Sequence, residues 1–178
     1  MNNPDNQLVI LVDANNTETG TMEKLEAHRQ GKLHRAISVF ICNTKGEWLL
    51  QRRALDKYHT AGLWSNTCCS HPYPGESSKD AATRRLKEEM GITTKLTELF
   101  GFLYKASLEN EITEHEYDEV FFGITNDLPN INRNEVMDWR YITFHQLEQE
   151  LEQDKDQFTV WFQKIFRKVH RNVENLIK

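Results

Sequence analysis

The sequence predicts an α+β fold in which strands and helices are mixed without regular βαβ alternation. Apolar runs of strand character occur at residues 8–12, 33–42, 47–53, 99–104 and 112–124. Apolar residues recur at helical spacing in three other segments, 79–90, 147–151 and 161–177. No internal repeat, low-complexity tract or long linker divides the 178 residues, so we expect one domain spanning 1–178.

The first elements are expected to pair as antiparallel strands. Residues 8–12 are a short apolar strand, and the stretch 13–20 is rich in Asn, Thr and Gly, which suits a turn into a second short segment. The runs 33–42 and 47–53 are joined by Asn43-Thr44-Lys45-Gly46, where Gly46 can take the positive φ of a tight turn. The sequence therefore predicts an opening hairpin and a central antiparallel pair.

The helix at 79–90 has signals at both ends. Ser77-Ser78 offers an N-cap, and Gly91 supplies a stop. Strands at 99–104 and 112–124 are expected next, and the helices at 147–151 and 161–177 are expected to pack on the sheet.

Composition limits the possible partners and the compartment. Lys and Arg number 22 against 27 Asp and Glu, and the net charge of -5 indicates neither a nucleic-acid nor a membrane-surface partner. The three cysteines, Cys42, Cys68 and Cys69, include a vicinal pair, which disfavours a disulfide framework and suits a reducing compartment. The polar start lacks signal-peptide features and no apolar run reaches membrane-spanning length, so we expect a cytoplasmic protein.

Three carboxylates alternate along the strand expected at 112–124. Glu114, Glu116 and Asp118 would share one face with apolar residues of the same run. Burying an unpaired carboxylate costs on the order of several kcal/mol, which a metal ion or a shared proton would offset. The alternative is a solvated acidic face at an exposed strand end.

Histidines could complete a metal site with these carboxylates. His28, His34 and His71 could converge with Glu114 and Glu116 on one divalent cation, since imidazole and carboxylate suit Mn, Zn, Fe or Mg. Their spacing alone leaves open the alternative of ordinary surface or hydrogen-bonded histidines. We assign that ordinary role to the remaining histidines, His59, His115, His145 and His170.

A thiol lies two residues from one of these imidazoles. Cys69 and His71 could exchange a proton, and no nucleophile-elbow sequence surrounds Cys69. A proton-transfer thiol and a buried structural thiol therefore remain equal alternatives. Together with the acidic strand, the pattern favours proton transfer over hydrolysis.

Residues 70–92 can be aligned with the Nudix box, whose helix projects carboxylates toward Mg²⁺ and a diphosphate. The residues that fit are Glu76, Arg84, Leu86, Glu88, Glu89, Gly91 and Ile92. Ser70 replaces the glycine of the box, and Arg85 replaces one of its glutamates. The alternative for Arg84, Arg85, Glu88 and Glu89 is an ordinary salt-bridged helix face.

With the run Trp-Ser-Asn-Thr-Cys-Cys-Ser-His-Pro at 64–72, the degenerate box, Tyr104 and Glu114-His115-Glu116, the chain resembles the metal-dependent, type 1 isopentenyl-diphosphate isomerases. This branch of the Nudix superfamily moves a double bond instead of cleaving a diphosphate. The resemblance covers roughly residues 8–161. It implies a Nudix-like mixed sheet flanked by helices, and isomerisation of isopentenyl diphosphate to dimethylallyl diphosphate in isoprenoid precursor biosynthesis.

The resemblance also implies roles for individual residues. Cys69 and Glu116 would be the acid and base on opposite faces of the alkene, with Tyr104 assisting at the glutamate. One Mn²⁺, Zn²⁺ or Mg²⁺ would be bound by His28, His34, His71, Glu114 and Glu116. A second ion, Mg²⁺ on the substrate diphosphate, would be held by Glu89 and the Cys69 carbonyl. Contacts to the substrate would come from Lys24, Arg53, Lys57 and Arg85 at the diphosphate and from Trp161 at the hydrocarbon.

Two other functions are compatible with parts of the sequence. Glu76, Glu88 and Glu89 would suit a Nudix-type hydrolase of a nucleoside diphosphate derivative, although Arg85 departs from its pattern. The ordinary interpretations of the histidines and carboxylates would suit a non-catalytic metal-binding or interaction module. For the isomerase we expect a small isoprenoid diphosphate as partner, no nucleic acid or membrane partner, and a monomer or weak dimer.

Overall fold

The computed structural model describes residues 7–57 and 59–177. Its strands are β1 Leu8–Val12, β2 Glu18–Glu23, β3 His34–Cys42, β4 Trp48–Arg53, β5 Trp64–Ser65, β6 Cys68–Ser70, β7 Thr97–Ser107, β8 Thr113–Ile124 and β9 Val136–Ile142. Its helices are α1 Lys24–Gln30, α2 Ser78–Met90, α3 Phe144–Gln153 and α4 Val160–Val173, with a short 3₁₀ turn at Lys155–Gln157. Among these described residues, no helix is long and apolar enough to cross a membrane.

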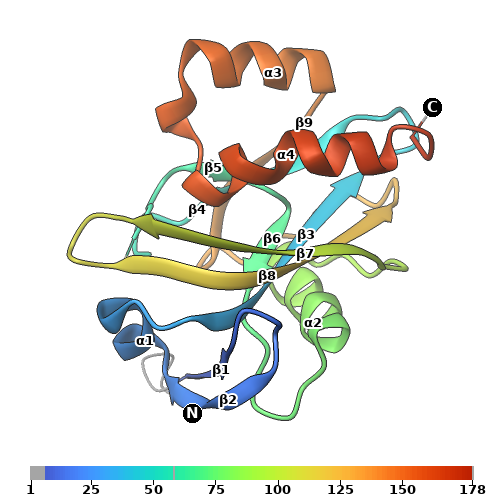
Figure 1. Cartoon of the computed structure of the whole chain (residues 1–178). Helices are drawn as coiled ribbons and strands as arrows, with labels where there is room; N and C mark the ends of the chain where they lie inside the picture. Colours follow the sequence, from blue (N-terminus) through green and yellow to red (C-terminus); the bar gives the residue numbers. More distant parts are fainter. Residues whose placement is uncertain (1–6, 58, 178) are drawn as a thin grey trace.

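Strand β3 is the hub of the sheet (Figure 1). Along one edge it pairs in turn with β1, β6 and β4, all antiparallel, and along the other edge it pairs with β8 in parallel. The long hairpin of β7 and β8 extends the sheet on that side, while β9 and β5 both pair with β4. The result is a mixed sheet, as the α+β prediction requires.

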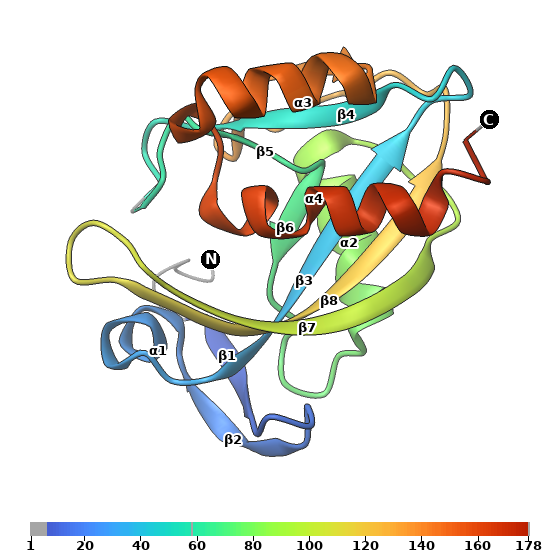
Figure 2. The ribbon, with the colours of Figure 1, turned by 45° about the horizontal axis from the view of Figure 1, so that its top comes forward.

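Helices cover the sheet on both faces (Figure 2). Helix α2 packs against β3 and β6 through Ala82, Leu86 and Met90, all buried. On the opposite face α4 buries Trp161 and Phe162 among the aromatic residues of a second core, and α3 lies beside it. These two cores fix both faces of β3 and β8, the strands that carry the site described below.

The predicted elements are largely confirmed. The opening hairpin is β1 and β2, the central pair is β3 and β4, and Gly46 has a φ of 76° in the turn between them. The expected limits are wrong in places: β7 and β8 together form a longer hairpin, and α4 ends at Val173, four residues before Ile177. Helix α1 and strand β9 were not expected. Helix α1 escapes notice because it is only 7 residues long and most of its positions are polar.

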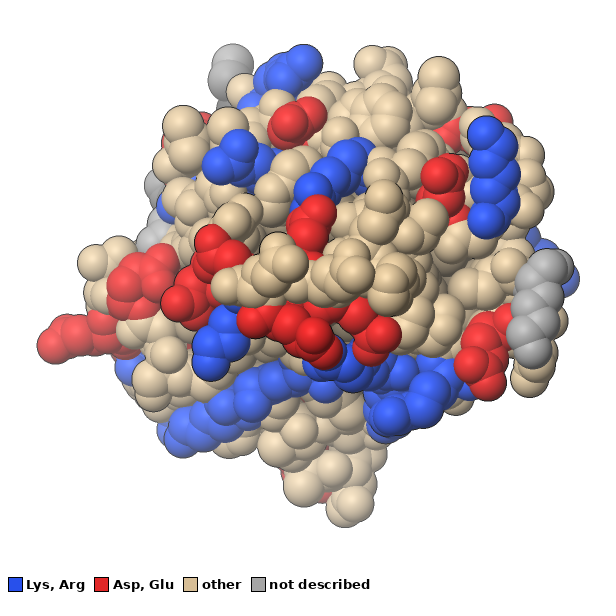
Figure 3. Space-filling view, turned by 90° about the horizontal axis from the view of Figure 1, so that it is seen from above, with Lys and Arg blue, Asp and Glu red and all other residues tan. Residues whose placement is uncertain are grey.

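Acidic and basic side chains lie side by side on the face that α3 and α4 cover (Figure 3). Arg140 pairs with Glu150 at 2.5 Å, and Arg167 pairs with Glu148 at 3.1 Å. Such exposed pairs contribute little to stability.

Helix α2 ends where the sequence predicts. Its C-cap residue Gly91 packs against the loop that contains Asn130. The Ser77 side chain caps the N-terminus by accepting from the Asp80 backbone, and Gly91 at the C-terminus adopts a φ of 69°. A Cβ at position 91 would lie only 2.6 Å from the carbonyl oxygen of Asn130. Only glycine therefore fits both the left-handed conformation and this close approach.

We expect Gly91→Ala to reduce the free energy of unfolding by about 2–4 kcal/mol, because it adds a steric clash to left-handed strain. Gly75→Ala is the matched control, since Gly75 has a φ of 82° but a Cβ at that position would meet no atom within 4 Å. The control should lose only about 1–2 kcal/mol. Urea unfolding measures both, and equal losses would show that the Asn130 loop yields freely.

Candidate active site

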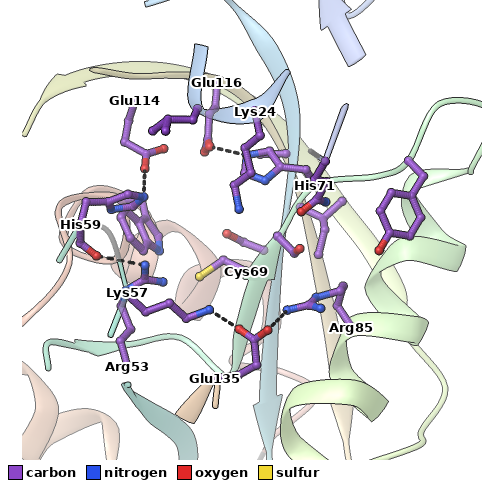
Figure 4. Close-up of a pocket in the computed structure, with 18 of the residues that line it drawn as sticks. Lys24, Arg53, Lys57, His59, Cys69, His71, Arg85, Glu114, Glu116 and Glu135 are labelled. Carbon is purple, nitrogen blue, oxygen red and sulfur yellow. Dashed lines mark hydrogen bonds and ion pairs between the residues drawn. The ribbon is translucent and has the colours of Figure 1, made fainter. Parts of the chain in front are cut away.

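A cavity of about 1080 Å³ lies where β6 and the first residues of β3 and β8 face the loop between β4 and β5 (Figure 4). Helix α1 contributes Lys24, α2 contributes Arg85 and α4 contributes Trp161. The site is therefore assembled from segments far apart in the sequence, on strands that both cores hold in place.

The acidic face predicted on β8 is buried. Exposure alternates along the strand, and Glu114, Glu116 and Asp118 are 3%, 6% and 1% exposed. The alternative of a solvated acidic strand end is therefore wrong. Asp118 lies behind the cavity, where it accepts a hydrogen bond of 2.7 Å from the Ser38 hydroxyl, and burial together with Glu116 raises its pKa.

Histidines from three segments meet the middle of this acidic face. Nitrogen atoms of His28, His34 and His71 and an oxygen of Glu116 all lie within 4.8 Å of one another. His34 is the register partner of Glu116 across β3 and β8, and its Nε2 is 3.5 Å from Glu116 Oε1. His71 follows β6, and its Nε2 is 3.0 Å from the same oxygen.

The orientations of these imidazoles suit metal binding. The Nδ1 atoms of His28 and His34 lie 2.7 and 2.8 Å from the backbone carbonyl oxygens of Lys24 and Lys32. A carbonyl can only accept, so each Nδ1 carries the proton and each Nε2 presents a lone pair to the cluster. Within the described residues Nε2 of His34 has no hydrogen-bond partner although it is buried. The donor set fits a divalent cation held by nitrogen and carboxylate oxygen.

Burial keeps the imidazoles of His28 and His71 neutral. It lowers the pKa of His28 to about 4, helped by His34, and lowers that of His71 to about 3. Neutral imidazole is the form that binds a metal. The protein is therefore set for binding at neutral pH without first removing protons from these rings.

The pKa values of the two cavity carboxylates, Glu114 and Glu116, are shifted in opposite directions. Burial and the neighbouring Glu116 raise the pKa of Glu114 well above its usual range. Burial opposes ionisation of Glu116 too, but the adjacent imidazoles of His34 and His71 outweigh it and hold the pKa of Glu116 well below its usual range. The Tyr104 hydroxyl donates to Glu116 Oε2 at 2.6 Å, and burial and both carboxylates raise its pKa.

The Cys69 sulfur points into the cavity (Figure 4). Burial raises the pKa of its thiol to about 12, against the opposing effect of Arg53. The nearest hydroxyl that interacts with it is Ser65 Oγ at 3.8 Å. A protonated thiol of this kind holds its proton in place and is not a pre-formed thiolate nucleophile.

Four cations surround another part of the cavity, namely Lys24, Arg53, Lys57 and Arg85. Glu135 lies between two of them, paired with Lys57 and, at 3.3 Å, with Arg85. Burial and the other three cations lower the pKa of Lys24 to about 8. This mutual repulsion makes the region a receptor for an anion with several charges.

The Nudix-box carboxylates lie mostly outside the cavity lining. Glu76 forms an ion pair of 2.7 Å with Arg84, and the Glu88 side chain is 43% exposed and paired with Arg84 and Arg85. These are the salt bridges of an ordinary helix face. Glu89 is different, since it is 4% exposed and lies behind the cavity wall, where it contacts Arg85 at 2.7 Å.

Trp161 contributes to the wall of the cavity. Its Nε1 donates to Asn66 Oδ1 at 3.2 Å, and the Arg53 guanidinium lies 5.3 Å from the ring centre. Trp161 therefore belongs both to the core that anchors α4 and to the cavity wall.

Sequence reasoning missed His59, which we expected to be an ordinary histidine. It is 6% exposed, lines the cavity, and its Nε2 lies 3.2 Å from Glu114 Oε1. It follows β4 in an irregular loop, where no periodicity marks a buried side chain. The useful signal was its position close to Arg53 and Lys57, both already assigned to the site.

Comparison with known proteins gives two kinds of match. A model of the NUDIX domain matches residues 32–162. Isopentenyl-diphosphate Delta-isomerase of Pectobacterium atrosepticum is 52% identical over 143 residues, 80% of each protein. Isopentenyl-diphosphate Delta-isomerase 1 of Aromatoleum aromaticum is 53% identical over 80% of this chain and 81% of that protein.

Solved structures show the same fold at low identity. A Deinococcus radiodurans protein has a TM-score of 0.70 at 17% identity, covering 83% of this chain and 90% of its own. The MutT protein of Methanosarcina mazei has a TM-score of 0.64 at 23% identity, covering 78% and 94%. The expected mixed sheet of Nudix type, flanked by helices, is thereby confirmed.

Because the pKa of His28 is lowered to about 4, we expect His28 to make the free energy of unfolding depend on pH in the acid range. Unfolded His28 takes up a proton near pH 6.5 and the folded ring does not, so its contribution to stability is present above pH 6.5 and is lost as pH falls toward 4. With metal removed, His28→Gln should flatten the dependence of unfolding free energy on pH by up to about 1.4 kcal/mol per pH unit.

The test is urea unfolding between pH 7.5 and 5. Comparing variants is necessary because the raised pKa of Glu114 acts in the opposite direction in the same range. His145→Gln is the control, since His145 is exposed on α3 and should leave the slope unchanged. Parallel slopes for His28→Gln and the unsubstituted protein would contradict the assignment of a neutral buried ring.

Proposed function

The chain belongs to the Nudix family and, within it, to the isopentenyl-diphosphate Delta-isomerases, and we propose that it converts isopentenyl diphosphate to dimethylallyl diphosphate. The observation that carries this proposal is the joint placement of a thiol, a carboxylate and a cluster of cations around one cavity. The whole chain, residues 1–178, is proposed to act as one isomerase domain on a small isoprenoid diphosphate.

The reaction moves a double bond, so it adds one proton and removes another. A proton bonds to the terminal alkene carbon, which leaves a tertiary carbocation. The carbon next to the oxygen-bearing carbon then loses a proton, and its C–H electrons form the new double bond. Atoms and charge balance, since one group of the protein has given a proton and another has taken one.

Cys69 and Glu116 are the proposed proton-transfer pair, because both line the cavity and come from different strands, β6 and β8. Tyr104 connects to Glu116 through its hydrogen bond of 2.6 Å and can pass a proton to or from that carboxylate. The reaction is reversible, so the donor in one direction is the acceptor in the other. Return of both groups to their starting state requires exchange with solvent protons.

The carbocation needs protection from water. The Trp161 ring faces the cavity, and an aromatic face stabilises a desolvated cation by about 2 kcal/mol. Binding of the charged tail far from the alkene supplies energy for positioning the small hydrocarbon. Lys24, Arg53, Lys57 and Arg85 are the proposed contacts for that tail.

The cofactors are proposed from the donor sets. Three histidines with Glu114 and Glu116 suit one Mn²⁺, Zn²⁺ or Mg²⁺, which would stabilise carboxylate charge beside Tyr104. The second proposed ion is Mg²⁺ on the diphosphate, with Glu89 and the Cys69 carbonyl as its protein ligands. We also propose a monomer or weak dimer, and the cytoplasm as compartment, because all three cysteines are free.

Hydrolysis of a nucleoside diphosphate derivative has less support. A Nudix hydrolase uses the box carboxylates around its metal ions, and here Glu76 and Glu88 are engaged by arginines outside the cavity lining. Arg85 also adds a positive charge where the box has a glutamate. Release of phosphate or of a nucleoside monophosphate from a substrate panel would revive this alternative.

The proposal predicts that purified protein with Mg²⁺ and Mn²⁺ converts isopentenyl diphosphate, followed by NMR of the product. Cys69→Ala and Glu116→Gln should each lower kcat by about 10²-fold or more, because each removes one proton-transfer group. Binding of the substrate, measured by calorimetry, should persist because the cationic residues remain.

Cys42→Ala is the matched control. It removes a buried thiol at the far end of β3, outside the cavity lining, and should keep the full rate. A near-normal rate in Cys69→Ala or in Glu116→Gln would remove that residue from the mechanism. An unchanged substrate, under conditions where a known isomerase converts it, would refute the function.

Removal of metal should abolish turnover, and Mn²⁺ or Zn²⁺ should restore it. At a free metal concentration of 100 times Kd, binding should also raise the unfolding free energy by about 2.7 kcal/mol. His34→Ala should show neither response, because it removes a ligand that is fully buried in the cluster. Full activity of the chelated protein would contradict a metal requirement.

A further inference from the structure

His59 lies at the metal cluster but is absent from the ligand set that the family resemblance implies. Its Nε2 is 3.2 Å from Glu114 Oε1, and the same oxygen is 3.8 Å from His28 Nε2. The three ligand atoms lie within 4.8 Å of one another and all three residues are buried. This group shares His28 with the cluster of His34, His71 and Glu116.

The loop holds the His59 backbone firmly. Arg53 donates from Nη2 to the His59 carbonyl at 3.2 Å and from Nε to the Thr60 carbonyl at 3.2 Å. The Thr60 backbone N–H donates to Glu109 Oε1 at 2.6 Å, and Thr60 has a φ of 48°, which is strained for a β-branched residue. A strained residue held by several hydrogen bonds is typical of a functional position.

The hydrogen bonds of Thr60 determine which nitrogen of His59 carries the proton. The Thr60 hydroxyl donates its only proton to the His59 carbonyl at 2.8 Å, because a carbonyl cannot donate. The same hydroxyl oxygen is 3.0 Å from His59 Nδ1 and can only accept there. Nδ1 of His59 therefore carries the proton, and Nε2 presents a lone pair to Glu114.

Nε2 of His59 and Oε1 of Glu114 thus lie 3.2 Å apart in a buried place. One cation can bind both atoms, with the carboxylate in its ionised form. Ligands at about 2.0–2.2 Å from one ion lie about 3 Å apart when adjacent, which matches the separation of His59 from Glu114. The Nδ1–H of His59 bonded to a hydroxyl is also the outer contact that orients a metal-binding imidazole.

We propose that His59 is a further ligand of the metal centre, binding through Nε2 beside His28 and Glu114. This proposal rests on the metal site of the proposed function, but it does not depend on the isomerisation reaction. An added imidazole makes the donor set richer in nitrogen. The centre should therefore prefer Mn²⁺, Zn²⁺ and other nitrogen-binding ions over Mg²⁺, which prefers oxygen ligands.

Pulsed EPR of the Mn²⁺-loaded protein, without substrate, counts directly bound imidazole nitrogens. His59→Ala should show one fewer bound nitrogen than the unsubstituted protein and weaken Mn²⁺ binding by about tenfold or more in calorimetry. His145→Ala, on the exposed side of α3, should change neither. An unchanged nitrogen count in His59→Ala would overturn the proposal, even if affinity falls, because His59 would then act only as a neighbour of Glu114.

A second pair of variants covers the case in which His59→Ala fails to fold. Thr60→Val removes the hydroxyl that orients the ring, whereas Thr60→Ser keeps it. Thr60→Val should weaken Mn²⁺ binding several-fold and Thr60→Ser should not, with melting of the metal-free proteins as a check of folding. Equal affinities in these two variants would also count against the proposal. Because neither measurement uses turnover, failure of the isomerase assay leaves this test unaffected.

Discussion

Glu114, Glu116 and Asp118 project from one face of β8 into a region that water hardly reaches. An isolated carboxylate there would cost on the order of several kcal/mol, so the surrounding structure must supply protons, hydrogen bonds or a cation. Tyr104 and His71 form hydrogen bonds with Glu116, while Asp118 is bonded to Ser38. The lowered pKa values of His28 and His71 and the raised pKa of Glu114 follow from this burial.

The cavity separates two kinds of electrostatic environment. Cations gather where a diphosphate would bind, and they repel one another enough to lower the pKa of Lys24 to about 8. Near β8 the charge is negative and balanced by imidazoles, with Cys69 held as a neutral thiol. We propose that a small substrate with a charged tail and an apolar head binds with its diphosphate at these cations and its alkene near Cys69, Glu116 and the Trp161 ring.

Sequence periodicity was sufficient for the elements with a regular buried face. It predicted α2 and its two caps, the central hairpin and the shared face of Glu114, Glu116 and Asp118. It could not find α1, because a helix of 7 residues shows little periodicity, nor the two-residue strand β5. The acidic residues of β8 were therefore accessible from local pattern.

Side chains that come together from separate elements and loops depended on information that the sequence alone does not carry. The convergence of His28, His34 and His71 could be proposed but not deduced, because it depends on the pairing of β3 with both β6 and β8. His59 was missed because its burial results from the path of an irregular loop that Arg53 fixes. The role of Glu135 between Lys57 and Arg85 likewise required the three-dimensional arrangement.

The central claim is that Cys69 and Glu116 exchange protons with a substrate lying between them. Isomerisation of isopentenyl diphosphate in deuterated water, with NMR of the product, tests this most directly. The account predicts dimethylallyl diphosphate with deuterium in the new methyl group. As the reaction reverses, recovered isopentenyl diphosphate should gain deuterium at the carbon next to the oxygen-bearing carbon. A product without deuterium at the methyl carbon, or release of phosphate in its place, would contradict the account.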